Sequence, residues 1–295
     1  MAEHGAVVVT GGSNGIGYFI SEQLAQAGRP VIIAARNAER AQLAMDAIRE
    51  RVPGAELSFQ ELDLGSLASV RRAADALAGN GPLAAVVANA GVVHDHGPAS
   101  TSDGFELFFG TNHLAHFALL ARLFPALRAT PGARMVHLGS LSHLWAKPVT
   151  GLPGERSWFS NYQNSKLAVM QFGFELDRRL RAHGIEARSV VAHPGNAPSA
   201  FTPERPGLHL REPIHPLLKA VVGNFSQGKD AGAWPAVHAA IGEDVQGGAL
   251  WGPGRLFQLL GRPAPAKASA QAYDGGQATR LWQLSAELTG VDFDF

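Results

Sequence analysis

The feature that most constrains the fold is a regular alternation of short apolar runs with longer segments of helical periodicity. The runs are rich in β-branched residues and apolar throughout, which is typical of parallel strands buried on both faces of a sheet. Strands are predicted at Ala6–Thr10, Val31–Ala35, Leu57–Leu62, Ala84–Ala88, Arg134–Gly139, Glu186–Ala192 and Ala249–Trp251. Helices are predicted over residues 15–28, 37–51, 66–78, 103–128, 158–183 and 229–241.

A repeated strand–helix pattern predicts the α/β class, in the form of a Rossmann-type doubly wound parallel sheet with helices on both faces and right-handed crossovers. The sequence contains no internal repeat, low-complexity tract or linker. We therefore expect a single domain over residues 1–295.

One stretch, from residue 197 to about 228, is irregular because prolines break helices and are excluded from central strands. Its prolines are Pro198, Pro203, Pro206, Pro213 and Pro216. It follows a predicted strand and so leaves the carboxyl edge of the sheet, where ligands bind in such folds. We expect a substrate loop or lid; a surface insertion without a role is the alternative. Its apolar residues either line an apolar pocket or pack within the lid or against a partner subunit: Phe201, Leu208, Leu210, Ile214, Leu217 and Leu218.

Charge and composition exclude several classes of function. Basic and acidic residues both number 25, so the chain lacks the positive surplus that nucleic acids and anionic membranes attract. Cysteine is absent, which excludes disulfides, thiolate nucleophiles and cysteine-ligated metals. No signal peptide precedes the first apolar run, and no uninterrupted apolar stretch has the length of a membrane span. We expect a cytoplasmic protein with no nucleic-acid or membrane partner.

A glycine-rich segment directly follows the first predicted strand. It reads Thr10-Gly11-Gly12-Ser13-Asn14-Gly15-Ile16-Gly17 and leads into the first predicted helix. Glycines there allow a tight turn and a close approach of phosphate to the backbone, while the free N–H groups of the new helix attract negative charge. The segment predicts a dinucleotide site; glycines that merely form a turn are the alternative. The expected binding residues are Gly11, Ser13, Asn14, Gly15, Ile16 and Gly17.

The residue after the second predicted strand bears on the choice of dinucleotide. An acidic residue about 20 positions after the glycine turn would accept hydrogen bonds from the ribose 2′-hydroxyl of NAD. Here the corresponding residue is Arg36, whose guanidinium suits a 2′-phosphate. Ser13 and Asn14 could donate to the same phosphate. We therefore expect NADP(H) to be favoured over NAD(H); the alternative is that Arg36 is a solvated residue at a helix start.

Tyr162 and Lys166 lie four residues apart in a predicted helix, so their side chains share one face. A nearby ammonium stabilises a phenolate and lowers the pKa of the tyrosine toward the working pH. The pair predicts an acid–base group, with a chance match on a surface helix as the alternative. Ser140 follows the fifth predicted strand, where its hydroxyl could donate to a substrate oxygen and stabilise developing charge. Ser142 is the alternative for that role.

The ordered motifs resemble those of the short-chain dehydrogenase/reductase family nearly from end to end. They are Thr10–Gly17, Asp63-Leu64, Asn89-Ala90-Gly91, Asn112, Ser140, Tyr162 to Lys166, and Pro194-Gly195. Within that family the chain is most similar to the branch of retinol dehydrogenases and protochlorophyllide reductases. The segments that carry this closer resemblance are Thr111–Phe117, Ser140–His143 and the stretch from Gln246 to Pro253.

The resemblance implies a role for each matching residue. Tyr162 would donate or accept the proton, Lys166 would also bind the nicotinamide ribose, and Asn112 would hold a water that links Lys166 to solvent. Asp63 and Leu64 would contact the adenine. Asn89, Ala90 and Gly91 would line the cofactor cleft, with a purely structural role for Asn89 as the alternative. Beside Pro194 and Gly195, Ser199 replaces the usual threonine that contacts the nicotinamide carboxamide, and Thr202 could substitute for it.

The expected function is therefore NADP(H)-dependent hydride transfer between nicotinamide and a carbonyl or alcohol carbon of a small, apolar substrate, with reduction of a ketone or aldehyde favoured. A catalytically silent cofactor-binding scaffold is the alternative. We expect no metal, because the histidines lack a third ligand at a suitable interval: His113, His116, His137, His143 and His193. The resemblance also implies a homodimer or homotetramer that pairs the helices predicted at 103–128 and 158–183.

Overall fold

Eight strands form a central sheet in the order β3-β2-β1-β4-β5-β6-β7-β8. Neighbouring strands are parallel except β7 and β8, which are antiparallel. The computed structural model describes residues 5–94, 99–147, 157–212, 214–215 and 221–295. Its strands are β1 (Ala6–Thr10), β2 (Val31–Ala35), β3 (Leu57–Glu61), β4 (Leu83–Ala88), β5 (Arg134–Leu138), β6 (Arg188–Ala192), β7 (Leu250–Arg255) and β8 (Leu260–Pro265).

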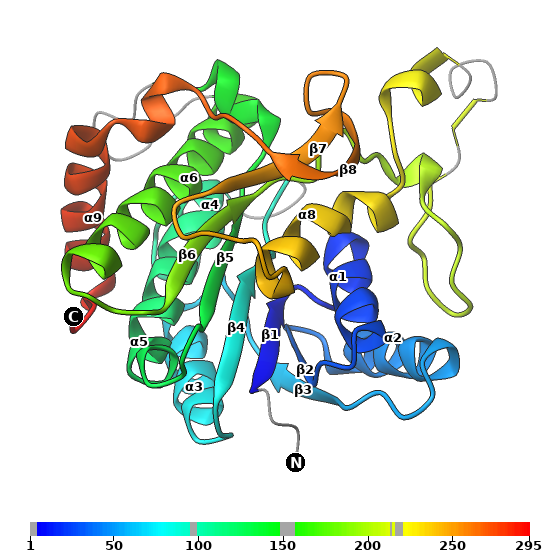
Figure 1. Ribbon diagram of the computed structural model, residues 1–295, viewed down its shortest axis with the longest axis horizontal. Helices are drawn as coiled ribbons and strands as arrows, with labels where there is room; N and C mark the ends of the chain where they lie inside the picture. The colour runs from blue at the N-terminus through cyan, green and yellow to red at the C-terminus, as the bar shows by residue number, and fades with distance from the viewer. Residues whose placement is uncertain (1–4, 95–98, 148–156, 213, 216–220) are drawn as a thin grey trace.

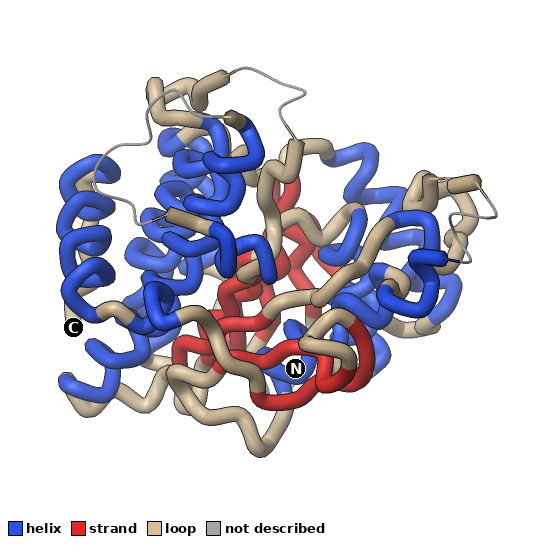
Figure 2. The backbone as a smooth tube through the Cα atoms, turned by 90° about the horizontal axis from the view of Figure 1, so that it is seen from above, coloured by secondary structure: helices blue, strands red, loops and turns tan. Residues whose placement is uncertain are grey.

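Helices cover both faces of this sheet (Figures 1 and 2). The longer helices are α1 (Gly15–Gln26), α2 (Ala38–Arg51), α3 (Leu67–Ala78), α5 (Ala115–Arg128), α6 (Trp158–Ala182), α8 (Lys229–Ile241) and α9 (Gly275–Thr289). Short segments are α4 (Leu107–Phe109), η1 (Gly110–Leu114), η2 (Leu141–Trp145), η3 (Ser199–Phe201), η4 (Gly223–Phe225) and η5 (Ala270–Tyr273). The arrangement confirms the predicted doubly wound α/β fold.

Successive side chains of β1 pack into two different hydrophobic cores, one on each face of the sheet, because side chains alternate between the faces of a strand. Val7 and Val9 pack with α1, α2 and α8 on one face, and Val8 packs with α3, α5 and α6 on the other. All three valines are fully buried. Burial on both faces explains why the strand is apolar without alternation, which is the pattern that predicted a parallel sheet.

The helix predicted over residues 103–128 begins later, at Leu107, and a π-turn interrupts it. The helical run consists of α4, the π-helical segment η1 and then α5. Asn112 lies in η1, and its side chain hydrogen-bonds both backbone groups of Val92, which follows β4. π-Turns interrupt helices most often at functional sites. Here the wider turn accompanies the contact between Asn112 and Val92, and periodicity alone does not reveal it.

Two C-terminal elements are absent from the sequence prediction. The strand β8 contains Pro263 and Pro265, which disfavour a strand except at a sheet edge, and β8 is an edge strand. Helix α9 carries sequence signals: Asp274 caps the Gln277 N–H, and Gly290 ends the helix in the left-handed conformation.

Helix α9 packs against α5 and α6, the helices on which the oligomer prediction depends (Figure 1). Trp282 of α9 is 3% exposed and packs edge-on against Phe117 of α5. Its indole N–H donates to Asp292, and the Arg179 guanidinium lies 4.1 Å from its ring centre. A second copy of the chain could reach this covered part of α5 and α6 only by displacing α9.

The predicted lid region is only partly described, and Pro213, Pro216, Leu217 and Leu218 lie outside the described residues. Leu210 is 3% exposed and belongs to the core shared by α1 and α8. Leu210 therefore packs on the body of the domain, and not within the lid or against a partner subunit as the packing alternative had it.

The contacts of Trp282 predict that shortening this side chain strongly destabilises the fold. Trp282→Ala should lower the free energy of unfolding by about 3–5 kcal/mol, the usual cost of emptying a buried aromatic site. Urea denaturation measures it. Trp234→Ala is the matched control because Trp234 is 38% exposed. A loss for Trp282→Ala no larger than that of the control would contradict the packing role of α9.

Candidate active site

The glycine turn joins β1 to α1 and is shaped for a phosphate. Gly11 and Gly15 have φ values of +66° and +57°, the left-handed region that favours glycine. A Cβ on Gly17 would lie 2.2 Å from the Gly11 carbonyl oxygen, so a side chain there has no room. The first turn of α1 carries no acidic residue. The predicted dinucleotide site therefore has the close backbone approach and the positive helix end that a pyrophosphate needs.

The asparagine at the end of β4 supports this turn. The Asn89 side-chain amide donates to the Thr10 carbonyl oxygen at 2.8 Å. The backbone N–H groups of Asn89 and Ala90 both donate to the Thr10 hydroxyl at 3.0 Å. A Cβ on Gly17 would also meet the Asn89 amide at 2.4 Å. These contacts give Asn89 the structural role that the sequence left as an alternative.

Arg36 lies beside the turn, because the Gly11 N–H donates to Ala34 at the end of β2. Its side chain is exposed and has no hydrogen-bond or ion-pair partner within the described residues. Asn14 caps α1 by accepting a hydrogen bond from the Gly15 N–H at 2.7 Å. Ser13 is half-buried on the same turn.

The adenine-site candidates follow β3, the strand beside β2. The Asp63 carboxylate accepts a hydrogen bond from the Gly65 N–H at 2.8 Å, which fixes its direction, and the side chain is exposed. Leu64 is 7% exposed and packs in the core, so only its backbone is available to a ligand.

The structure brings Tyr162 of α6 to two serines that follow β5. The hydroxyls of Ser140 and Ser142 lower the phenol pKa, but burial is the larger effect and raises it above its ordinary value of 10. Both serines therefore lie near the phenol, and the Ser142 hydroxyl oxygen is buried without a hydrogen-bond partner among the described residues. The sequence argument expected an ammonium to lower this pKa; here burial of the ring outweighs the groups that favour the phenolate.

Lys166 is buried one turn further along α6. Its ammonium donates to the Leu138 carbonyl oxygen at 2.9 Å, two residues before Ser140. Burial lowers the pKa of Lys166 to about 8. A Cβ on Gly91 would lie 2.9 Å from Oδ1 of Asn112 and 3.7 Å from Nζ of Lys166. A side chain at position 91 would therefore crowd the Asn112 amide and reach van der Waals contact with the Lys166 ammonium.

The side chain of Asn112 is fully engaged with its neighbours. Its Oδ1 accepts from the Val92 N–H at 2.7 Å, and its amide donates to the Val92 carbonyl and to the Ser165 hydroxyl. Its backbone carbonyl oxygen accepts from Nδ1 of His116 at 3.0 Å. Asn112 therefore ties the end of β4 to α6 beside Lys166.

The turn after β6 is held by the β7–β8 hairpin. Gly195 has φ +68°, and a Cβ there would lie 2.3 Å from the Leu259 carbonyl oxygen. Beyond Pro194 and Gly195, the Ser199 hydroxyl donates to Glu212 of the lid at 3.2 Å. Thr202 is 2% exposed and accepts from the Lys229 N–H. Ser199 is therefore the more accessible of the two hydroxyls.

The histidines of the region are structural supports, a role that sequence spacing did not assign individually. The Nδ1 of His143 donates to the Ser140 carbonyl at 2.6 Å, and its Nε2 accepts from the Ser269 N–H. Nε2 of His193 donates to Gln258 while its Nδ1 accepts from Gly195. Among the described residues, no three histidine, aspartate or glutamate side chains are grouped to hold a metal.

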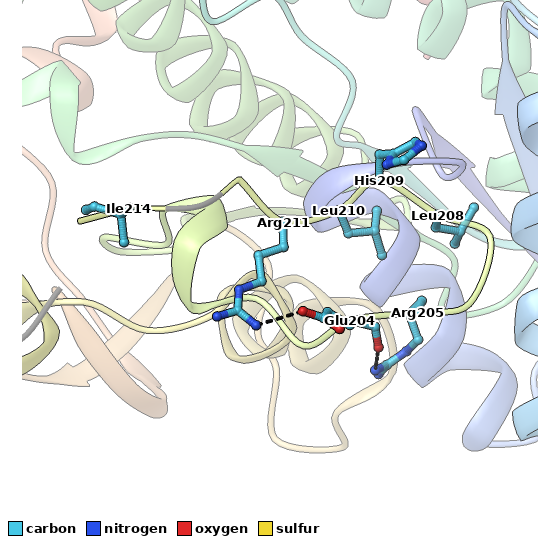
Figure 3. A pocket seen from close by; sticks show the side chains of 7 residues that line it. All are labelled: Glu204, Arg205, Leu208, His209, Leu210, Arg211 and Ile214. Atoms are coloured by element: carbon cyan, nitrogen blue, oxygen red, sulfur yellow. Dashed lines mark hydrogen bonds and ion pairs between the residues drawn. The ribbon is translucent and has the colours of Figure 1, made fainter. Parts of the chain in front are cut away.

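A pocket of about 480 Å³ lies apart from these groups, within the lid (Figure 3). An ion pair between Glu204 and Arg211 crosses it at 2.9 Å. Its lining residues are Glu204, Arg205, Leu208, His209, Leu210, Arg211 and Ile214. None of the predicted catalytic residues contributes to this lining, so we do not assign it to the reaction.

Known proteins similar to this chain agree with the geometry. A family model described as short chain dehydrogenase matches residues 5–205. The chain belongs to the short-chain dehydrogenase family. Retinol dehydrogenase 12 of Mus musculus is 34% identical, over 98% of this chain and 87% of its own length. Polyprenol dehydrogenase of Mus musculus is 35% identical over 96% of this chain and 83% of its own.

Solved structures extend the comparison. A crystal structure of an uncharacterised protein from Mycobacterium paratuberculosis is 33% identical, covers 100% of this chain and 96% of its own, and has a TM-score of 0.78. A Pseudomonas aeruginosa protein, solved as an active-site complex with NADP, is 26% identical over 84% and 94% of the two chains, with a TM-score of 0.61.

Membership of this family, with retinol and polyprenol dehydrogenases among the relatives, confirms the predicted resemblance. The protein is an oxidoreductase that uses a nicotinamide cofactor and acts on alcohol or carbonyl groups. Within the described part of the chain, no helix has both the length and the apolar character needed to cross a bilayer.

Three histidines buried in the core predict acid sensitivity. Burial lowers the pKa of His113 and His137 to about 3 and that of His116 to about 4. Below the ordinary pKa of 6.5 the unfolded chain binds protons there while the folded chain does not. The free energy of unfolding should therefore fall as the pH drops from 6.5 toward 4, by about 1.4 kcal/mol per histidine and pH unit.

Urea denaturation between pH 7 and pH 5 measures this slope. His137→Gln keeps a donor for the Ser189 hydroxyl. This substitution should reduce the slope of the unfolding free energy with pH by the amount that one bound proton contributes. His209→Gln is the control, because His209 is exposed. An unchanged slope in His137→Gln would show that this histidine is protonated in the folded protein.

Proposed function

We propose that the protein is an NADP(H)-dependent carbonyl reductase for a small apolar ketone or aldehyde. The proposal rests on one observation above all. The Tyr162 phenol lies near the hydroxyls of Ser140 and Ser142, and the Lys166 ammonium is held on Leu138 of the strand that leads to them. When bound, the nicotinamide cofactor supplies the hydride, and this cluster handles the proton and the charge on the substrate oxygen.

The raised pKa of Tyr162 supports the reductive direction. A phenol with a pKa above 10 is protonated at neutral pH, so it is a donor to a carbonyl oxygen that gains negative charge. The hydroxyls of Ser140 and Ser142 can donate to the same oxygen, since charge that develops there is stabilised by donors already in place. Oxidation of an alcohol would need the phenolate, which burial disfavours.

Two observations support NADP(H). Arg36 is an exposed guanidinium beside the glycine turn, without a partner among the described residues. The carboxylate that would accept the ribose hydroxyls of NAD is replaced by this cation. One structural neighbour was solved as an NADP complex.

The surroundings of Tyr162 support an apolar substrate. The η2 segment, which begins after Ser140, exposes Leu144 (51%) and Trp145 (66%). The first turn of α6 exposes Trp158 (39%) and Phe159 (48%). These four exposed apolar side chains lie near Ser140 and Tyr162 in the sequence, and they support an apolar substrate. The relatives named as retinol and polyprenol dehydrogenases act, by their names, on apolar alcohols.

The acid–base assignment predicts the effect of removing one hydroxyl. Tyr162→Phe should lower kcat by about 10²–10⁴-fold, the usual contribution of a general acid, and leave the Kd for NADPH nearly unchanged. Loss of nicotinamide absorbance with a panel of apolar aldehydes and ketones measures kcat. Tyr273→Phe is the control, because Tyr273 is 50% exposed. Retention of most activity by Tyr162→Phe would exclude its role as the acid.

The cofactor preference has its own test. Arg36→Asp should weaken NADPH binding about tenfold or more relative to NADH, because a carboxylate replaces the partner of the 2′-phosphate. Fluorescence titration gives both Kd values. Arg280→Asp, an exposed site on α9, carries the same charge change as a control. An unchanged ratio of the two Kd values would overturn the NADP(H) preference.

A further inference from the structure

Helix α8 begins directly opposite the glycine turn. Helix α8 packs against α1 (Figure 1), and Lys229 is its first residue. A Cβ on Gly15 would lie 3.9 Å from Nζ of Lys229. The ammonium is therefore at the position where the turn and the start of α1 are shaped for a phosphate.

The Lys229 ammonium is partly buried but has no counter-charge within contact distance in the described part of the chain. Within the described residues, Nζ of Lys229 has no hydrogen-bond or ion-pair partner, although Glu212 attracts it at longer range. The side chain is half-buried, and burial lowers its pKa. Burial of a cation costs free energy unless an anion compensates. Lys166, by comparison, has the Leu138 carbonyl as its acceptor.

The backbone around Lys229 is fixed on both sides. Its N–H donates to the Thr202 hydroxyl at 3.3 Å, and the Gln23 side chain of α1 donates to the Asp230 carbonyl at 2.8 Å. The second bond joins the first turn of α8 to α1 directly. Little backbone ordering is then needed for Lys229 to act on a ligand at the turn, which favours binding.

We propose that Lys229 binds the pyrophosphate of the dinucleotide cofactor and completes, from α8, the phosphate site that the glycine turn forms from α1. The inference deepens the proposed function and rests on it. The pyrophosphate is the phosphate in question, because Gly15 lies at the N-terminus of α1, where that group sits in such folds. Arg36 follows β2 and faces the 2′-phosphate instead, so the two cations recognise different parts of one ligand.

The test compares ligands that share the pyrophosphate. Lys229→Met in the full-length protein should raise the Kd for NADPH, NADH and ADP-ribose by about tenfold each, measured by calorimetric titration. Lys229→Arg should retain most of the affinity. Lys267→Met is the control, because Lys267 is exposed and its substitution removes the same charge.

Three results would overturn the proposal. Loss confined to NADPH would assign Lys229 to the 2′-phosphate, and equal affinities in Lys229→Met and wild type would exclude a ligand role. Glu212→Gln tests whether Lys229 acts through its attraction to Glu212 instead of through phosphate. If Lys229 binds phosphate, Glu212→Gln should leave the affinity for the three ligands unchanged or improve it. A loss of affinity equal to that of Lys229→Met would show that Lys229 acts by holding the segment of Glu212. If the wild-type protein bound none of the three ligands, the proposed function itself would fail.

Discussion

The site depends on a buried chain of hydrogen bonds that begins at Thr10. Its hydroxyl accepts the N–H groups of Asn89 and Ala90 and lies 2.9 Å from Nε2 of His116. Burial lowers the pKa of His116 to about 4, so the ring is neutral. Its Nδ1 donates to the Asn112 carbonyl, which leaves Nε2 to accept the Thr10 proton. Because every member of this chain is paired, the phosphate turn, the end of β4 and the start of α5 are held in one arrangement.

Local signals in the sequence account for the parts of the site that local geometry determines. The glycine turn needs Gly11 and Gly15 at positive φ and Gly17 for close contact, and these requirements are visible as glycines between a strand and a helix. A parallel sheet covered on both faces follows from buried, unbroken apolar strands. Contacts between distant segments have no local sequence signal. Thr10 and His116, for example, are 106 residues apart, and only the fold brings them together.

The same distinction explains what the sequence could not provide for Tyr162. Its spacing from Lys166 predicts a shared helix face, and α6 carries both residues. The pKa of the phenol, however, depends on how deeply the ring is buried and on which hydroxyls reach it, and both are tertiary properties. Helix α9 is the opposite case, since the cap at Asp274 and the terminal Gly290 are readable without the fold.

A buried carboxylate of α1 holds the segment that the sequence predicted as a lid. Glu22 of α1 is 2% exposed and accepts hydrogen bonds from Nε and Nη2 of Arg205 at 2.9 and 2.8 Å. Nε of Arg51 in α2 lies 2.7 Å from the same carboxylate. The Arg205 guanidinium also lies 5.0 Å from the ring centre of Phe19. Removal of Glu22 would leave the Arg205 guanidinium, whose side chain is 9% exposed, without its counter-charge, which is costly in a buried site. The segment around Arg205 is therefore held on α1 through this carboxylate.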